Sequence, residues 1–208
     1  MPSSRARWFG LLFISIAVSL IIVDTTIVNV AIPSIVDDIG IDSTQVQWVQ
    51  ESYTLVFAAL LITFGTLADR IGRRKLLIIG VAVFTIASIC AGLSPTGDTL
   101  IAARVLQGVG GAIVLPTTLS IINSSFRGKE RAMAFAIWGS TIGGMAAVGP
   151  LLGGWLTTDF SWRWAFGVNV PFGVLVIIGL LFTVAESSAA ERASFDLVGA
   201  ALTVLGAG

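Results

Sequence analysis

Three ionisable residues fall inside long apolar stretches and carry the clearest chemical signal in the sequence. They are Asp24, Glu51 and Arg104. A charged side chain at mid-bilayer costs a few kcal/mol, so such residues usually face a partner or water and mark function. With a rise of about 1.5 Å per residue along three separate helices, we expect all three in one layer near the outer face. A carboxylate beside an arginine in that layer could load a proton in one conformation and release it in another.

Polar helix faces surround two of these residues. Three polar residues share the face of Glu51, because positions three, four and seven apart lie on one side of a helix: Gln47, Gln50 and Thr54. Such a face suits the wall of a cavity and would offer a cationic ligand a counter-charge. Gln107 shares a face with Arg104, beside small glycines that allow close contact with a neighbouring helix. We expect Gln107, like the residues around Glu51, to contact the substrate.

A plainer interpretation of these charges stays open. Glu51 could reach the outer membrane interface, and Arg104 could simply neutralise Asp24 as a structural pair. We favour Asp24 as the proton carrier, since counting residues along each helix places Asp24 deeper below the outer membrane face than Glu51.

The composition places the chain in a membrane. Of 208 residues, 55% are hydrophobic and only 12% are charged, whereas soluble domains carry about 25% charged residues. A spanning helix needs roughly 20 apolar residues. Apolar windows lie at about residues 9–33, 46–66, 76–93, 99–122, 132–156 and 164–185. We therefore predict an all-α membrane protein with six transmembrane helices.

The cations indicate how these helices are oriented. Arg5 and Arg7 precede the first span, four cations lie between the second and third spans, and three lie between the fourth and fifth. The alternate loops carry mostly aspartates, with Arg163 as their single cation. Short loops rich in Lys and Arg stay on the cytoplasmic side. We therefore expect a cytoplasmic N-terminus and a multi-pass protein of the cytoplasmic membrane.

Few residues are available for metal binding or catalysis. The sequence has no His and a single Cys, Cys90, which we interpret as a small buried hydrophobe. One Cys excludes an internal disulfide and a Cys-based zinc site. We expect no enzyme, no cofactor and no nucleic-acid partner. A channel is disfavoured because the inner half of the predicted spans is nearly bare of ionisable side chains, while a non-transporting sensor or assembly protein stays open.

Five motifs, in order along the chain, resemble a known family. Residues 65–75 are similar to the signature loop between the second and third spans of the major facilitator superfamily, and residues 104–108 to its fourth-span motif. Residues 149–154 are similar to the fifth-span antiporter motif of its exporters. Residues 24–33 and 162–171 resemble the first span and the entry to the sixth span of its fourteen-span drug:proton antiporters.

The resemblance implies efflux of hydrophobic or cationic drugs and small metabolites, driven by inward proton flow. Asp24 and Arg104 would then be the coupling pair, and Glu51 would contact cationic substrates. Six residues would latch the two halves of the transporter on the cytoplasmic side: Gly65, Asp69, Arg70, Gly72, Arg73 and Arg74. Four residues of the fifth span would disfavour uptake-type leaks: Gly149, Pro150, Gly153 and Gly154.

The length departs from that family pattern. Residues 1–185 would form the six-helix N-terminal bundle, residues 186–196 a cytoplasmic connector, and residues 197–208 the truncated start of a seventh helix. The expected partners are the lipid bilayer, protons, a small-molecule substrate and a missing C-terminal half. We interpret the chain as an N-terminal fragment that is not active alone, and a half-size protein that dimerises or does not transport is the alternative.

Overall fold

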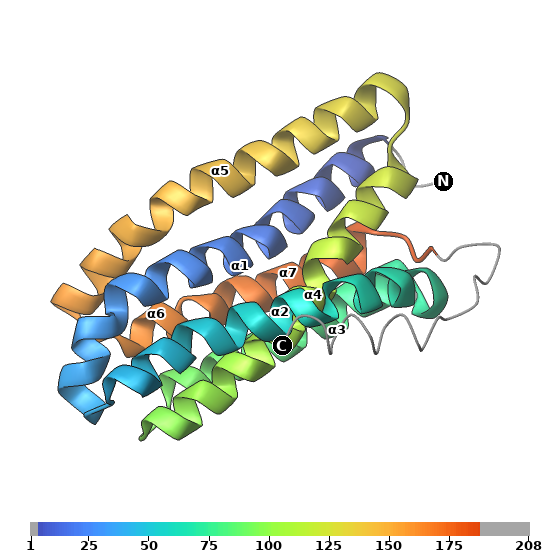
Figure 1. Cartoon of the computed structure of the whole chain (residues 1–208). Coiled ribbons are helices and arrows are strands. Elements are labelled where there is room, and N and C mark those ends of the chain that lie inside the picture. Colours follow the sequence, from blue (N-terminus) through green and yellow to red (C-terminus); the bar gives the residue numbers. More distant parts are fainter. Residues whose placement is uncertain (1–3, 188–208) are drawn as a thin grey trace.

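The computed structural model describes residues 4–187 (Figure 1). Over that range the chain forms seven helices: α1 (Ser4–Ile39), α2 (Ser43–Ile71), α3 (Arg73–Gly92), α4 (Gly97–Ser125), α5 (Gly128–Asp159), α6 (Arg163–Gly167) and α7 (Asn169–Thr183). Within the described residues, six helical segments are long and apolar enough to cross a membrane, the last being α6 and α7 together. The prediction of six spans is therefore confirmed. The predicted connector and seventh-helix start, from residue 188 onward, lie outside the described residues.

Side-chain caps fix where two of the spans begin. The backbone N–H of Gln45 donates to the Asp42 carboxylate at 2.8 Å, and the Gln45 side chain accepts in return from the Asp42 backbone. Thr96 and Thr99 form the same reciprocal pair at the start of α4. Each arrangement satisfies N–H groups that a helix leaves without an intrahelical acceptor. The polar residues at the span ends therefore set the helix boundaries, which apolar windows alone cannot do.

The helices pack as an antiparallel bundle in which α4 contacts both α2 and α3, and α1 contacts both α5 and α7 (Figure 1). Glycines allow the closest approaches. A Cβ on Gly108 would come within 2.7 Å of the Tyr53 carbonyl oxygen, and one on Gly110 within 2.7 Å of the Phe84 backbone nitrogen. Real Cβ atoms do not approach backbone that closely. The glycines at these two positions therefore allow α4 to pack directly against the backbones of α2 and α3.

The glycines of the fifth-span motif divide into two groups. A Cβ on Gly149 would overlap the Thr26 side chain of α1, and one on Gly153 would lie 3.0 Å from Ile27. Gly154 has open space at its Cβ position, and α5 continues through Pro150 without interruption. Two of the four motif residues therefore provide the contact surface for α1.

One end of the bundle gathers the N-terminus, the α4–α5 turn and the segment after α7. Arg7 donates to the Ser125 carbonyl at 3.0 Å and pairs with Glu130 at 3.3 Å. At the same end, Arg74 donates to the Val184 carbonyl at 3.2 Å. Most of the cations thus lie at one end, as the alternation of spans predicts.

Two details of the structure differ from the sequence interpretation. Hydrogen bonding along the sixth span is interrupted next to Val168, which itself keeps a helical φ of −60° and ψ of −28°, and Pro171 has no N–H to donate to the preceding turn. Cys90 is exposed, so its interpretation as a buried residue was wrong. It lies on the side of α3 that also exposes Ile86 and Ile89, and an apolar helix in a membrane can turn such a face toward lipid.

Candidate functional site

The centre of the bundle holds a buried ion pair. An Nη1 hydrogen of Arg104, on α4, is donated to Oδ2 of Asp24, on α1, and the two residues are 2% and 0% exposed. The Arg104 Nε–H donates to the Val49 carbonyl at 3.0 Å, and its guanidinium carbon lies 4.3 Å from the centre of the Tyr53 ring. A desolvated charge pair needs such additional partners, because its mutual attraction alone rarely offsets the loss of water.

The second carboxylate oxygen of Asp24 is held by two amides. The Gln107 Nε2 donates to Oδ1 at 2.9 Å, and the Asn169 Nδ2 donates to the same atom at 3.1 Å. Both amides also donate to the Ser88 hydroxyl oxygen, at 2.9 and 3.3 Å. Side chains of α1, α3, α4 and α7 are therefore joined in one hydrogen-bond network around this carboxylate. We call these residues the Asp24 cluster: Asp24, Ser88, Arg104, Gln107 and Asn169.

Sequence reasoning named three members of this cluster and missed two. The structure brings Asp24 and Arg104 together and places Gln107 with them as a fully buried residue, while its contact with a substrate stays a prediction. Ser88 was missed because nothing in its apolar run distinguishes it. Asn169 lies in the sixth-span motif at residues 162–171, but its position in the sequence does not reveal that it contacts Asp24.

Glu51 lies apart from the Asp24 cluster. The side of α2 that carries Val49 and Tyr53 is buried, whereas Glu51 is exposed and accepts from the Gln47 side chain at 3.3 Å. Beside it, the Gln50 amide donates to the Asn29 side chain of α1 at 2.9 Å. Thr54 is also exposed, and its hydroxyl bonds back to the Gln50 carbonyl. The α2 face is thus an open polar surface, to which α1 contributes Asn29.

The motif loop between α2 and α3 is held by the segment that follows α7. Gly72 has a φ of 111°, and a Cβ there would come within 2.7 Å of the Glu186 carboxylate. That carboxylate accepts the backbone N–H groups of Arg74 and Lys75 at 3.1 and 3.0 Å, which caps the start of α3. A Cβ on Gly65 would lie 3.6 Å from the Pro116 side chain of α4, while the side chain of Asp69 lies outside the described residues.

Replacing Glu186 with Ala is expected to expose this loop. The variant removes the acceptor for two helix N–H groups, and losing such a cap costs about 1 kcal/mol, or roughly a fivefold increase in local opening. Trypsin should then cleave after Arg73 and Arg74 about fivefold faster. Glu130→Ala, which removes the ion pair with Arg7 at the same end, is the matched control. Equal cleavage rates for Glu186→Ala and the unmodified chain would show that the cap does not protect the loop.

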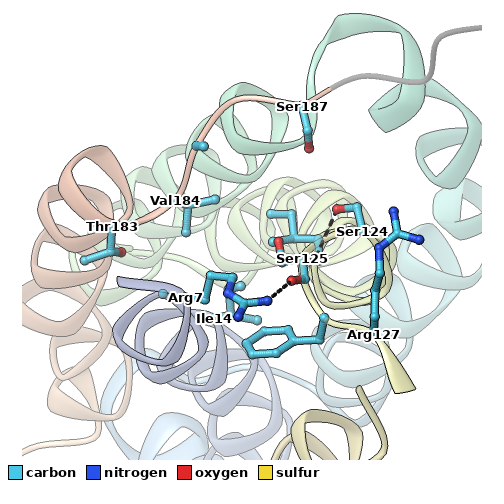
Figure 2. A pocket seen from close by; sticks show the side chains of 12 residues that line it. Arg7, Ile14, Ser124, Ser125, Arg127, Thr183, Val184 and Ser187 are labelled. Atoms are coloured by element: carbon cyan, nitrogen blue, oxygen red, sulfur yellow. Dashed lines mark hydrogen bonds between the residues drawn. The ribbon is translucent and has the colours of Figure 1, made fainter. Parts of the chain in front are cut away.

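A cavity of about 370 Å³ opens at this end of the bundle (Figure 2). Its lining comes from the first turns of α1, the last turns of α4 and the end of α7, and includes Arg7, Arg127 and the adjacent serines 124 and 125. Arg7 precedes Asp24 by 17 residues, which corresponds to about 25 Å along a helix. This cavity is therefore separate from the Asp24 cluster.

Comparison with known proteins agrees with this architecture. The profile of the Major Facilitator Superfamily matches residues 14–205. The chain belongs to the major facilitator superfamily. Membership makes it part of a family of transporters rather than enzymes, and a multi-pass membrane protein.

The superfamily members most similar in sequence include proteins named for antibiotic resistance. The chain is 41% identical to the puromycin resistance protein pur8 of Streptomyces alboniger, over 100% of this chain and 41% of that protein. It is 40% identical to the lincomycin resistance protein of Streptomyces lincolnensis, over 96% of this chain and 41% of that protein. The chain thus spans about two fifths of the length of these relatives.

Solved structures of low sequence identity share the fold. A bacterial homologue of the human lysosomal transporter Spinster, in an inward-facing and occupied conformation, superposes with a TM-score of 0.77 at 23% identity. The match covers 91% of this chain and 47% of that one. At this identity the likeness concerns the fold alone, and it again involves about half of the neighbour.

Proposed function

We propose that this chain supplies one helical bundle of an exporter that exchanges protons for hydrophobic or cationic small molecules. The observation that carries the proposal is a carboxylate, Asp24, buried in a hydrogen-bond network that joins four helices and paired with Arg104. An ionisable group at that depth is normally functional. The resistance names of the 40–41% identical relatives support export as the direction of transport.

The proposed coupling uses the two charge states of Asp24. With the carboxylate ionised, Arg104, Gln107 and Asn169 hold α1 to α4 and α7 through charge-assisted hydrogen bonds. A proton on the carboxylate weakens its attraction to Arg104, so the same helices are held less tightly. A two-state bundle biased in this way can alternate between openings, provided that substrate and proton favour different states.

The proposed orientation places the cation-rich end in the cytoplasm. That end carries Arg7, Arg74 and the α4–α5 turn, and short basic loops stay on the cytoplasmic side. The loop that Glu186 caps would then act as the cytoplasmic latch against a second bundle. Relatives more than twice as long as the matched region support the presence of that second bundle, with the transport path between the two.

The experiment joins this chain to the part of the Streptomyces alboniger relative that it does not span. Everted membrane vesicles carrying this chimera should take up ethidium from the medium into the lumen when the lumen is acidified. An uncoupler should stop this uptake. The chain expressed alone should show no such movement. An inactive chimera that reaches the membrane in full amount, beside an active relative, would contradict the proposal.

Glu51 is expected to set the preference for charge on the substrate. It lies on the exposed face of α2 with Gln47 as its hydrogen-bond donor. Two opposite unit charges about 4 Å apart attract each other by about 1 kcal/mol in water and about 4 kcal/mol at the dielectric constant of a protein surface. Glu51→Gln in the chimera should therefore raise the KM for a dication about tenfold, while the KM for a monovalent dye changes less. Thr54→Val, on the same face, is the control. An equal effect on both substrates would exclude charge recognition by Glu51.

A further inference from the structure

One polar atom of the Asp24 cluster takes part in none of its hydrogen bonds. Asn169 is fully buried, and its Nδ2 group donates to Asp24 Oδ1 and to Ser88 Oγ. Its Oδ1 atom has no hydrogen-bond partner among the described residues. Most buried side-chain polar atoms find a partner, so an exception beside a functional carboxylate calls for an explanation.

The chemistry of the amide supplies that explanation. A side-chain amide presents a donor on one side and an acceptor on the other. The donor side suits an ionised carboxylate, which can only accept. A protonated carboxyl group has an O–H of its own, which needs an acceptor. With the amide as it stands, that O–H would point at the N–H of Asn169.

We propose that Asn169 is a positioning residue that follows the charge state of Asp24 by turning its amide. When a hydronium ion gives its proton to Oδ1 of Asp24, an O–H bond of the hydronium breaks and leaves water, a new O–H bond forms, and the carboxylate becomes neutral. A half-turn about the Cβ–Cγ bond of Asn169 then brings its Oδ1 to accept that O–H, and the reverse turn accompanies proton release. This inference rests on the proposed loading of a proton at Asp24.

Among the side chains that hydrogen-bond Asp24, Asn169 is the one whose acceptor atom has no partner among the described residues. Arg104, on α4, presents only donors. Gln107 has its carbonyl oxygen occupied by Arg104 Nη1 at 2.8 Å. Ser88, on α3, donates its hydroxyl hydrogen to the Phe84 carbonyl at 2.8 Å. The side chain of α7 that faces the carboxylate is Asn169 itself, and α2 contributes Tyr53 against Arg104.

The sequence makes the test direct, since asparagine occurs only three times, at positions 29, 123 and 169. Asn29 and Asn123 are exposed, so an Asn29→Ser/Asn123→Ser variant leaves Asn169 as the single asparagine. That variant, labelled with carbon-13 and nitrogen-15 asparagine in phospholipid nanodiscs, is studied by pH-difference infrared spectroscopy. The carbonyl band of a protonated carboxyl that is absent in Asp24→Asn reports the charge state of Asp24.

We expect the labelled amide carbonyl band to move to lower wavenumber with the same pH midpoint as the Asp24 carboxyl band, because the amide oxygen gains a hydrogen bond. Adding Asp24→Ser, which brings no second labelled asparagine into the protein, should abolish both changes. In the unmodified labelled chain, Asn169→Leu should remove the amide change. Ser19→Ala, which removes a buried hydroxyl bonded to the Ser15 carbonyl instead, should leave both changes in place.

The possible failures are distinguishable. A carboxyl band that titrates while the labelled amide band stays fixed would overturn the role of Asn169 and leave the proton-loading proposal standing. The absence of any titrating carboxyl band that depends on Asp24 would overturn the proton-loading proposal itself, and the amide exchange with it. An amide change that persists in Asn169→Leu would assign the response to another asparagine and would also overturn the inference.

Discussion

Asp24→Asn in the chimera is expected to reduce proton-driven ethidium efflux to the level of vesicles that lack the transporter. The amide has nearly the size of the carboxyl group but cannot take up and release a proton. It also leaves the Arg104 guanidinium buried without a counter-charge, which costs about 3–5 kcal/mol in stability. Efflux in everted vesicles and thermal unfolding of the purified chain measure the two consequences separately.

A double variant separates lost coupling from lost folding. Asp24→Asn/Arg104→Gln replaces the buried pair with neutral groups that can still hydrogen-bond, so most of the lost stability should return, since replacing both partners avoids the unpaired charge. Efflux should stay absent, because no proton carrier has been restored. Full gradient-driven efflux in the single Asn variant would refute the assignment of Asp24 as the carrier.

Gly110→Val is expected to be strongly destabilising although it lies outside the Asp24 cluster. The first atom of the new side chain would lie 2.7 Å from the Phe84 backbone nitrogen, so α3 and α4 must separate. Overpacking of this kind typically costs 1–3 kcal/mol, and because backbone rather than a flexible side chain is in the way we expect about 3 kcal/mol. Unfolding of the isolated chain in detergent measures the loss.

Gly143→Val provides the matched comparison. Gly143 lies on α5, and apart from its own helix no described residue has a heavy atom within 4 Å of its Cβ position. Valine there should change the stability of the isolated chain by less than about 1 kcal/mol, the ordinary difference between residues in a helix. Similar losses at both positions would mean that the close approach of α3 and α4 contributes nothing specific.

The residues explain why the elements could be predicted from sequence and part of the site could not. Long apolar stretches fix the helices, because an isolated backbone in lipid must satisfy its own hydrogen bonds. Asp24 and Arg104 could be paired in advance because each is costly in hydrocarbon alone, and their depths along two helices agree. Ser88 and Cys90 carry no such penalty, so nothing in their apolar surroundings tells which of them turns inward.

Glu51 shows the limit of counting depth along a helix. The count predicts a layer but not a direction around the helix axis, and the structure turns Glu51 to the open side of α2 while Val49 and Tyr53 face inward. Asn169 shows the opposite case. It meets Asp24 because α7 packs against both α1 and α3, an outcome of tertiary packing.

The glycines on two sides of α4 have a mechanical consequence. A helix in backbone contact with α2 through Gly108 and with α3 through Gly110 has no layer of long side chains over which to slide. Helices α2, α3 and α4 should therefore rock as one block. Any change of shape inside the bundle must then occur where this block meets α1 and α7. The hydrogen bonds of the Asp24 carboxylate hold that interface together.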